Sequence, residues 1–323
     1  MATPQLEGDL KKLHVQSRQD RKKKRGRKWM IIVASILGAL VLGMAGGYMW
    51  LLSLQNKMQL KPKDAEKINK VVAAPQGDGI NIVLAGTDRR ANWTSSRADS
   101  LMFIHADKKT KKIYMLSIPR DTRVMIPGRG MDKINHSWAF GGAPLLIRTV
   151  SDFVNQPVNY YFQVDYGRFE EAVNAMGGVD FATDLSFYDG ELGVAVRPGL
   201  RHREGKEALA IVRNRHVGSG GGGDLARVPV QQQFIQAMMA QSIKSYADVP
   251  RMANVVASYV NTNMGLTEML ATGRAFADSS RQIDMAILPG KGVMINRISY
   301  VIPDLGAKDT LLSAMLSNKP FPR

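Results

Sequence analysis

Cysteine is absent from this chain of 323 residues. Its absence excludes disulfides, thiolate zinc sites, iron–sulfur clusters and cysteine nucleophiles. The five histidines show neither HExxH nor HxxxH spacing, which argues against a zinc site, and no GxSxG elbow or Walker loop is present. The chemistry that remains open is the kind carried by carboxylates and cationic side chains.

Acidic residues are also scarce, because 28 Asp and Glu stand against 44 Lys and Arg, a net charge of +16. Residues 1–28 hold +7 of this excess and the rest of the chain holds +9. The main domain is therefore basic in its own right and favours anionic ligands. The polybasic run 21–28 could be a nucleic-acid arm, but beside an apolar segment we interpret it as a topology signal that contacts anionic lipid headgroups. No nucleic-acid partner is expected.

Charge is missing altogether from Trp29–Leu54, a stretch of 26 residues. This is long enough to span a bilayer, and too long for the apolar core of a cleaved signal peptide, which is the alternative reading. Ten Lys and Arg precede the stretch and five follow closely, so the positive-inside rule places the N-terminus in the cytoplasm. We therefore predict a single-pass protein of the cell membrane with its main domain outside. Its predicted parts are a cytoplasmic tail (1–28), a transmembrane helix (29–54), a stalk (55–78) and an extracytoplasmic domain (79–323).

Strand-like and helix-like segments alternate beyond residue 79 without strict βαβ repetition. Buried or alternating strands are predicted at 80–86, 100–106, 113–118, 160–164 and 282–288, the second and third forming a hairpin. Helices are predicted at 144–155, 169–176, 204–213, 224–244, 249–259, 267–276 and 304–317. The pattern indicates an α/β or α+β domain in which helices cover a mixed central sheet.

Charged side chains cluster where the first three strands end or begin. If the first strand lies beside the third, their carboxyl ends share one edge of the sheet with the start of the second. We expect Asp88, Arg97, Asp99, Arg120 and Arg123 to meet there.

A second set of polar side chains surrounds the glycine loop 218–223. It consists of Arg213, Arg215, Arg227 and Gln231, the last two sharing one helix face. Arginine binds phosphate oxygens with two parallel hydrogen bonds, and carboxylates bind Mg²⁺. Together the two sets suggest phosphoryl chemistry, whereas each residue alone could be a solvated cap or surface ion pair.

These segments resemble the LytR-CpsA-Psr family of cell-wall ligases over residues 80–240. The matching motifs, in order, are GTDRR, RADS, SIPRDTRVMIPG, DKINHSWAFGG, YYFQVDYGRFEEAVNAMGGVD and VRNRH…GGDLARVPVQQQF. The resemblance implies an enzyme that moves a glycopolymer, such as a teichoic acid or capsular polysaccharide, from a polyprenyl-diphosphate lipid to peptidoglycan through a phosphodiester. It also implies an apolar cavity between sheet and helices for the lipid tail.

Residue roles follow from the same resemblance. Asp88 and Asp99 would hold Mg²⁺ or Mn²⁺. As a separate hypothesis of mechanism, Asp99 or Asp121 would serve as base, with Asp99 preferred. The diphosphate would be bound by Arg97, Arg120, Arg213, Arg215, Arg227 and Gln231.

One departure from the family pattern is Val230, which stands where a further arginine usually precedes the glutamine pair. One phosphate contact is therefore missing from the expected set, which suggests weaker diphosphate binding, a different acceptor or reduced activity. Two other functions remain open: a polyprenyl-diphosphate hydrolase with water as acceptor, and a non-enzymatic regulator of the cell envelope.

Overall fold

The chain divides into two units, residues 1–53 and 54–323. A computed structural model describes residues 46–58, 60, 62–88, 97–165, 168–214, 228–241, 254–255, 257–276 and 282–322. In the first unit the described residues, 46–53, are helical. The predicted tail (1–28) and most of the predicted transmembrane segment (29–54) lie outside the described residues. Across the described ranges, no helix combines the length and the apolar character needed to cross a bilayer.

The second unit is built on a six-stranded sheet in the order β11-β6-β1-β2-β3-β12. Its strands are β1 (Gly79–Asp88), β2 (Arg97–Asp107), β3 (Lys112–Ser117), β6 (Tyr160–Asp165), β11 (Val260–Thr262) and β12 (Gln282–Ile287). The pairs β1–β6 and β3–β12 are parallel, and β1–β2, β2–β3 and β6–β11 are antiparallel. The predicted mixed central sheet is thus confirmed, as is the predicted hairpin of β2 and β3.

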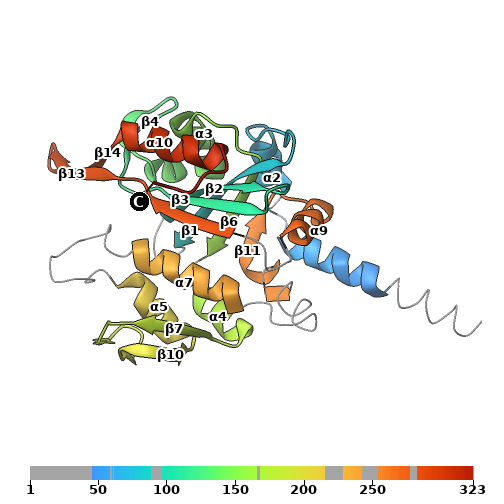
Figure 1. The fold of residues 1–323 in the computed structure, drawn as a ribbon, viewed down its shortest axis with the longest axis vertical. Coiled ribbons are helices and arrows are strands. Elements are labelled where there is room, and N and C mark those ends of the chain that lie inside the picture. The colour runs from blue at the N-terminus through green and yellow to red at the C-terminus, as the bar shows by residue number, and fades with distance from the viewer. Residues whose placement is uncertain are drawn as a thin grey trace, which may run out of the picture. The chain divides into compact units, whose positions relative to one another are not determined.

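Helices cover both faces of this sheet (Figure 1). One face packs against α2 (Pro62–Asn69), α3 (His136–Val154) and α10 (Leu305–Leu316), forming the largest apolar core. On β1, Val83 and Ala85 face that core, whereas Ile80 and Ile82 belong to a second cluster beside α9 (Leu266–Ala275). This alternation is the period of two expected of a strand buried on both faces.

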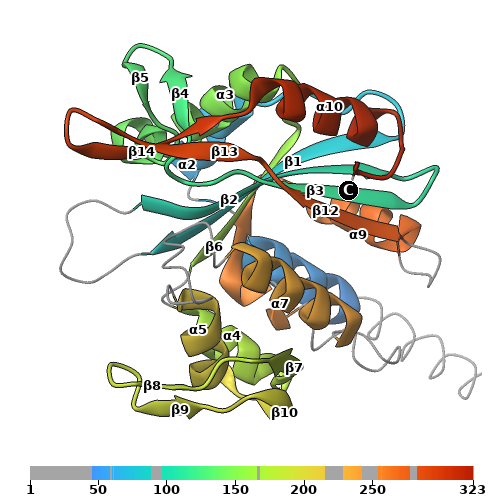
Figure 2. The same ribbon diagram turned by 60° about the vertical axis from the view of Figure 1, so that its left-hand side comes forward.

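A smaller cluster forms around α4 (Phe169–Met176), α5 (Gly205–Arg213) and α7 (Val228–Gln241), as both ribbon views show (Figure 2). Two short ribbons complete it: β7 (Val179–Thr183) with β10 (Gly199–Arg203), and β8 (Phe187–Asp189) with β9 (Val194–Val196). Two further hairpins lie elsewhere in the second unit: β4 (Arg123–Ile126) with β5 (Gly130–Lys133), and β13 (Gly290–Ile295) with β14 (Ile298–Pro303).

Arg203 is fully buried in the smaller cluster. Its guanidinium donates to the Glu207 carboxylate and to the carbonyl oxygens of Phe181, Arg197 and Gly199. A buried charge is tolerated when it is paired and hydrogen-bonded in this way. Arg203 therefore holds β7, β10 and α5 together and takes no part in the predicted site.

The stalk predicted at 55–78 is wrong over part of its length. Pro62–Asn69 forms α2, and Ile68 is fully buried in the largest core. Two of the lysines that suggested a solvated linker, Lys63 and Lys67, lie on the outer side of this helix, and Lys70 is exposed directly after it. An amphipathic helix with a narrow apolar face accounts for the polar composition equally well.

Helix α3 begins eight residues earlier than the predicted start at Pro144. Gly141 and Gly142 have non-helical backbone angles, and Gly142 has a φ of 63°, so the helix is kinked there. Pro144 stands directly after the kink, where it begins a new helical stretch and needs no backbone N–H donor.

Buried His105 gives the main sheet a pH-sensitive contact. Its Nδ1 lies 2.7 Å from Oδ1 of Asn81, and burial lowers the pKa of His105 below 6.5 although Asp107 acts to raise it. The folded state binds a proton on His105 less tightly than the unfolded chain does. The contribution of neutral His105 to folding stability is therefore present above pH 6.5 and is lost as the pH falls through the pKa of His105 in the folded state. We expect the urea midpoint to drop between pH 7.5 and pH 5.5, and to drop less in His105→Gln, which cannot titrate. Equal drops in both proteins would contradict this account.

Candidate functional site

Asp99 is the extra residue of a β-bulge at the end of the β1–β2 ladder. Gly86 is paired with Ser100 and Thr87 with Ala98, so Asp99 has no partner residue on β1. A bulge bends the strand and changes the direction in which a side chain points, and bulges are common beside active sites. The irregularity therefore singles out Asp99 as a positioned carboxylate.

The Asp99 carboxylate is bound by Arg120, which donates from Nη1 to Oδ1 over 2.6 Å. The side chains are 28% and 20% exposed, respectively, so the pair is partly shielded from water while remaining open to a ligand. Arg120 lies in the turn after β3, where its carbonyl oxygen accepts from the N–H of Asn135. The structure thus brings together two residues of the predicted site, Asp99 and Arg120.

The first and third predicted strands are not neighbours, because β2 lies between them. Since β2 is antiparallel to both, its first residues still reach the edge of the sheet at which β1 and β3 end. The strand ends therefore share one edge of the sheet and bring Asp99 and Arg120 together, although the assumed adjacency of the first and third strands is wrong.

Asp88 and Arg97 are paired across the same ladder, two residues beyond the bulge. Their side chains lie outside the described part of the structure, as does the side chain of Gln231 in α7. Arg215 and Arg227 lie outside the described residues. Their predicted roles remain predictions.

Asp121 and Arg123 have other contacts in this structure. Oδ1 of Asp121 lies 2.9 Å from Nζ of Lys133, and the guanidinium of Arg123 lies 5.8 Å from the centre of the Tyr300 ring. The first contact connects the turn after β3 to β5, and the second connects β4 to β14. Asp121 is therefore neutralised by a lysine that the sequence reading did not single out.

Arg213, at the end of α5, is paired with two carboxylates of the β8–β9 ribbon. Its Nη2 donates to Glu191, and its Nε lies 3.6 Å from Oδ2 of Asp189. The Arg213 side chain is 32% exposed. A phosphate ligand at this guanidinium would have to compete with these carboxylates.

A cluster of His136, Asp132 and Tyr300 lies near Asp121, and the sequence reading assigned none of the three to the site. Nδ1 of His136 lies 2.9 Å from Oδ2 of Asp132, and the Tyr300 hydroxyl lies 3.4 Å from Oδ1. Burial acts to raise the pKa of Asp132, but hydrogen bonds from His136, the Lys133 backbone and Tyr300 together lower it. Asp132 therefore stays ionised and holds the imidazole at the start of α3. The i, i+4 spacing of Asp132 and His136 was the available signal.

Gln232 anchors α7 on the central sheet. Its Nε2 donates to Oγ of Ser117 over 2.8 Å and to the carbonyl oxygen of Ala286 over 3.0 Å, and the residue is 8% exposed. The helix that follows Arg227 is thereby fixed to the carboxyl end of β3, which leads into Arg120. Pro229 occupies the first turn of α7, where a missing N–H costs nothing.

We expect Gln232→Leu to lower the free energy of unfolding by about 1–3 kcal/mol, because two hydrogen bonds are lost and buried acceptors are left without this donor. Chemical denaturation followed by circular dichroism measures the change. Gln233→Leu is the matched control, since Gln233 is the exposed neighbour on the same helix. An unchanged midpoint in Gln232→Leu would show that the contact does not secure α7.

The acidic residues at the bulge suit a hard divalent cation. Among the described residues, no three His, Asp or Glu side chains gather as a metal-binding group. Mg²⁺, however, commonly takes one or two carboxylates, completing its shell with water and substrate phosphate oxygens. Asp99 has two carboxylate oxygens, of which one accepts from Arg120, so it can contact a guanidinium and a cation at once. The donor chemistry therefore fits Mg²⁺ or Mn²⁺.

The fold and the site together define a class of protein: a mixed α/β domain with an acidic and a cationic side chain paired where its central strands end. The chain belongs to the LytR_cpsA_psr family, whose family model matches residues 48–316. The predicted family resemblance is confirmed.

Individual relatives agree with this assignment. The polyisoprenyl-teichoic acid–peptidoglycan teichoic acid transferase TagU of Bacillus subtilis (strain 168) is 33% identical over 299 residues, covering 90% of this chain and 95% of its own. The crystal structure of B. subtilis TagV superposes with a TM-score of 0.67 at 28% identity, covering 77% of this chain and 100% of that chain. A structure of TagT bound to LIIa-WTA superposes with a TM-score of 0.62 at 25% identity, covering 75% of this chain and 91% of that chain.

Proposed function

We propose that this protein transfers a teichoic-acid-type glycopolymer from a polyprenyl-diphosphate carrier to peptidoglycan, forming a phosphodiester. Its relative TagU is named for this transfer, and the TagT structure is described as bound to LIIa-WTA. The observation that carries the proposal in this chain is the Asp99–Arg120 pair at the bulge. The pair consists of a carboxylate and a guanidinium at the end of the sheet, and a guanidinium is a side chain suited to phosphate.

The proposed reaction is a displacement at phosphorus. A peptidoglycan hydroxyl oxygen forms a bond to the phosphorus next to the polymer sugar, the bridging P–O bond breaks, and polyprenyl phosphate leaves. Asp99 accepts the hydroxyl proton, with Asp121 as the alternative base. Asp99 is favoured because it lies at the bulge beside Arg120, whereas Asp121 pairs with Lys133 of β5 at 2.9 Å.

Cationic side chains stabilise the charge of the diphosphate. Arg120 is positioned for this role, and Arg213 joins it when phosphate oxygens replace Glu191 and Asp189. Arg97, Arg215, Arg227 and Gln231 complete the proposed set. Guanidinium groups suit the task because they donate two parallel hydrogen bonds to phosphate oxygens.

Asp88 and Asp99 would hold Mg²⁺ or Mn²⁺. A bound cation of this kind supplies neutralisation of phosphate charge. The chain's own residues orient the ion and the donor lipid. The lipid tail would lie in an apolar space between sheet and helices, and the basic tail 1–28 with Trp29–Leu54 would anchor the protein in the cell membrane with the domain outside.

The proposal is tested with full-length protein in detergent, a purified lipid-linked glycopolymer and peptidoglycan strands. The expected product is glycopolymer joined to peptidoglycan, formed together with polyprenyl phosphate and dependent on a divalent cation. Release of free polymer phosphate at the same rate with and without peptidoglycan would instead indicate the hydrolase. No turnover of the lipid under any condition would favour the regulator.

A further inference from the structure

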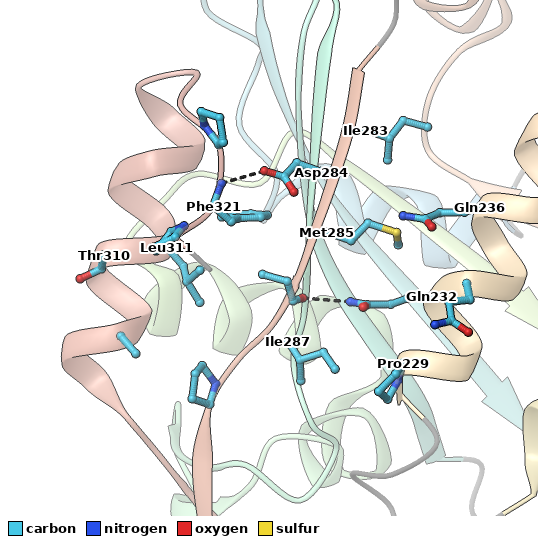
Figure 3. A pocket seen from close by; sticks show the side chains of 16 residues that line it. Pro229, Gln232, Gln236, Ile283, Asp284, Met285, Ile287, Thr310, Leu311 and Phe321 are labelled. Atoms are coloured by element: carbon cyan, nitrogen blue, oxygen red, sulfur yellow. Dashed lines mark hydrogen bonds between the residues drawn. The ribbon is translucent and has the colours of Figure 1, made fainter. Parts of the chain in front are cut away.

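A groove of about 700 Å³ runs along β12, the edge strand of the central sheet. Figure 3 shows β12 as its floor, with α7 as one wall and α10 and the C-terminal segment as the other. Ile283, Met285 and Ile287 point toward the α7 side, and Asp284 and Phe321 lie on the α10 side. The volume is within the range of pockets that bind ligands.

The floor of this groove presents unpaired backbone groups. The N–H groups of Gln282 and Leu288 donate to the carbonyl oxygens of Lys111, just before β3, and of Ser117, at its end, over 3.1 and 2.9 Å. Backbone direction alternates along a strand, so the groups of Ile283, Met285 and Ile287 point away from β3. Outside the β12–β3 ladder, no backbone hydrogen bond reaches these three residues within the part of the chain that the structure describes. The edge is therefore available for a further strand.

The walls offer side-chain contacts on both sides of that edge. On α7, Gln233 and Gln236 are exposed, and each amide can both donate and accept. On α10, Thr310 is exposed beside the groove. The backbone edge of β12 with flanking amides suits a polar, extended peptide better than an apolar ligand.

The groove leads to the proposed active site. Pro229 and Pro289 line its end nearest the carboxyl end of β3. There Gln232 binds Ser117, three residues before Arg120, and Pro229 stands two residues after Arg227. A chain lying along β12 would thus extend toward the Asp99–Arg120 pair.

We propose that this groove binds the peptide part of the peptidoglycan acceptor, which adds to the open edge of β12 as an extended strand. The inference rests on the proposed transfer, and it assigns the recognition of the acceptor to a surface distinct from the diphosphate site. Main-chain hydrogen bonds supply the affinity in strand addition, and flanking side chains supply the selectivity. Peptide-bearing strands would be held with their sugar hydroxyls near Asp99.

The test compares binding of soluble peptidoglycan strands that carry their peptides with strands from which the peptides have been removed. Full-length protein in detergent is used without any lipid donor, so the result does not depend on transfer. We expect the peptide-free strands to bind at least about tenfold more weakly. Equal binding of the two probes would overturn the proposal and indicate that the groove recognises sugar or another partner.

Two substitutions connect the binding to the groove. Met285→Pro removes one outward N–H, a change that edge strands tolerate, and should weaken peptide-dependent binding by about fivefold to tenfold. Met285→Leu, which keeps the N–H, should cause a smaller loss.

Because the proline variant could disturb the sheet, Thr310→Trp provides a second test by filling the groove from α10. Ser313→Trp is its control, being exposed on α10 outside the groove.

Both groove variants should raise the KM for peptidoglycan and leave the KM for the lipid donor unchanged. Wild-type binding by both Met285→Pro and Thr310→Trp, with melting temperatures unchanged, would contradict the assignment. Failure of the transfer assay alone would count against the proposed function and leave the binding result standing.

Discussion

Replacing Arg120 with alanine is expected to lower kcat/KM for glycopolymer transfer by about 100-fold or more. The guanidinium is held by Asp99 at 2.6 Å at the edge of the sheet, so its charge is positioned before the substrate arrives. Removing one such positioned donor typically costs about 100-fold to 1000-fold in rate. The measurement is the initial rate of transfer from a lipid-linked donor at several donor concentrations.

Loss of a charge anywhere on this basic domain could weaken binding of an anionic lipid, so the control is Arg129→Ala. Arg129 is exposed on the β4–β5 turn, outside the proposed site. Its guanidinium carbon lies 5.1 Å from the centre of the Phe140 ring. We expect this control to keep most of its activity. Arg120→Lys should recover part of the loss, because lysine restores the charge but not the paired hydrogen bonds. Wild-type kcat/KM in Arg120→Ala would remove Arg120 from the mechanism.

Asp99→Asn is expected to lower kcat by about 100-fold or more while leaving the fold intact. The amide is isosteric and its oxygen can still accept from Arg120, but it cannot take a proton at neutral pH and binds a cation more weakly. Loss of a general base alone costs about 100-fold to 10,000-fold. The loss should be visible in kcat, since the proton moves in the chemical step.

A titration with Mg²⁺ separates the two roles proposed for Asp99. If the carboxylate holds the cation, higher Mg²⁺ should recover part of the activity of Asp99→Asn. If it acts as base, added Mg²⁺ should change nothing and the pH profile should lose its acidic limb. Asp152→Asn, an exposed change on α3, is the control. Unaltered kcat in Asp99→Asn would refute both roles.

Local signals predicted several elements closely. The helix predicted at 169–176 is α4, and Gly177 ends it in the left-handed conformation with a φ of 88°. Asp304 caps α10, where its carboxylate accepts from the N–H of Ala307 over 2.9 Å. Both ends are determined by residues within one turn of the helix, which is why the sequence alone was sufficient.

Features that depend on tertiary contacts were missed. The short ribbons β4–β5 and β8–β9 carry few alternating apolar residues, so their pattern was too weak to detect. Helix α2 was predicted to be a stalk because of its polar, lysine-containing composition, whereas the buried side chain of Ile68 packs it on the core. Each of these elements forms because it packs against segments that are distant in the sequence.

Of the candidate site, the meeting of Asp99 with Arg120 was predicted from the sequence, whereas the other observed pairings were not. Strand ends indicated that Asp99 and Arg120 would meet, and they do. The bulge that positions Asp99 depends on the register between two strands, which cannot be read from either strand alone. Likewise, the pairing of Arg213 with Glu191 joins residues 22 positions apart through a ribbon that the sequence did not reveal.

The most direct test of the central claim is a crystal structure of this protein with a polyprenyl diphosphate and Mg²⁺. We expect the diphosphate to lie at the bulge, with phosphate oxygens bonded to Arg120 and the cation in contact with Asp99. The Arg213 guanidinium should then contact phosphate oxygens in place of the Glu191 carboxylate. A diphosphate bound away from the β1–β2 bulge, with the Asp99–Arg120 pair untouched, would contradict the account.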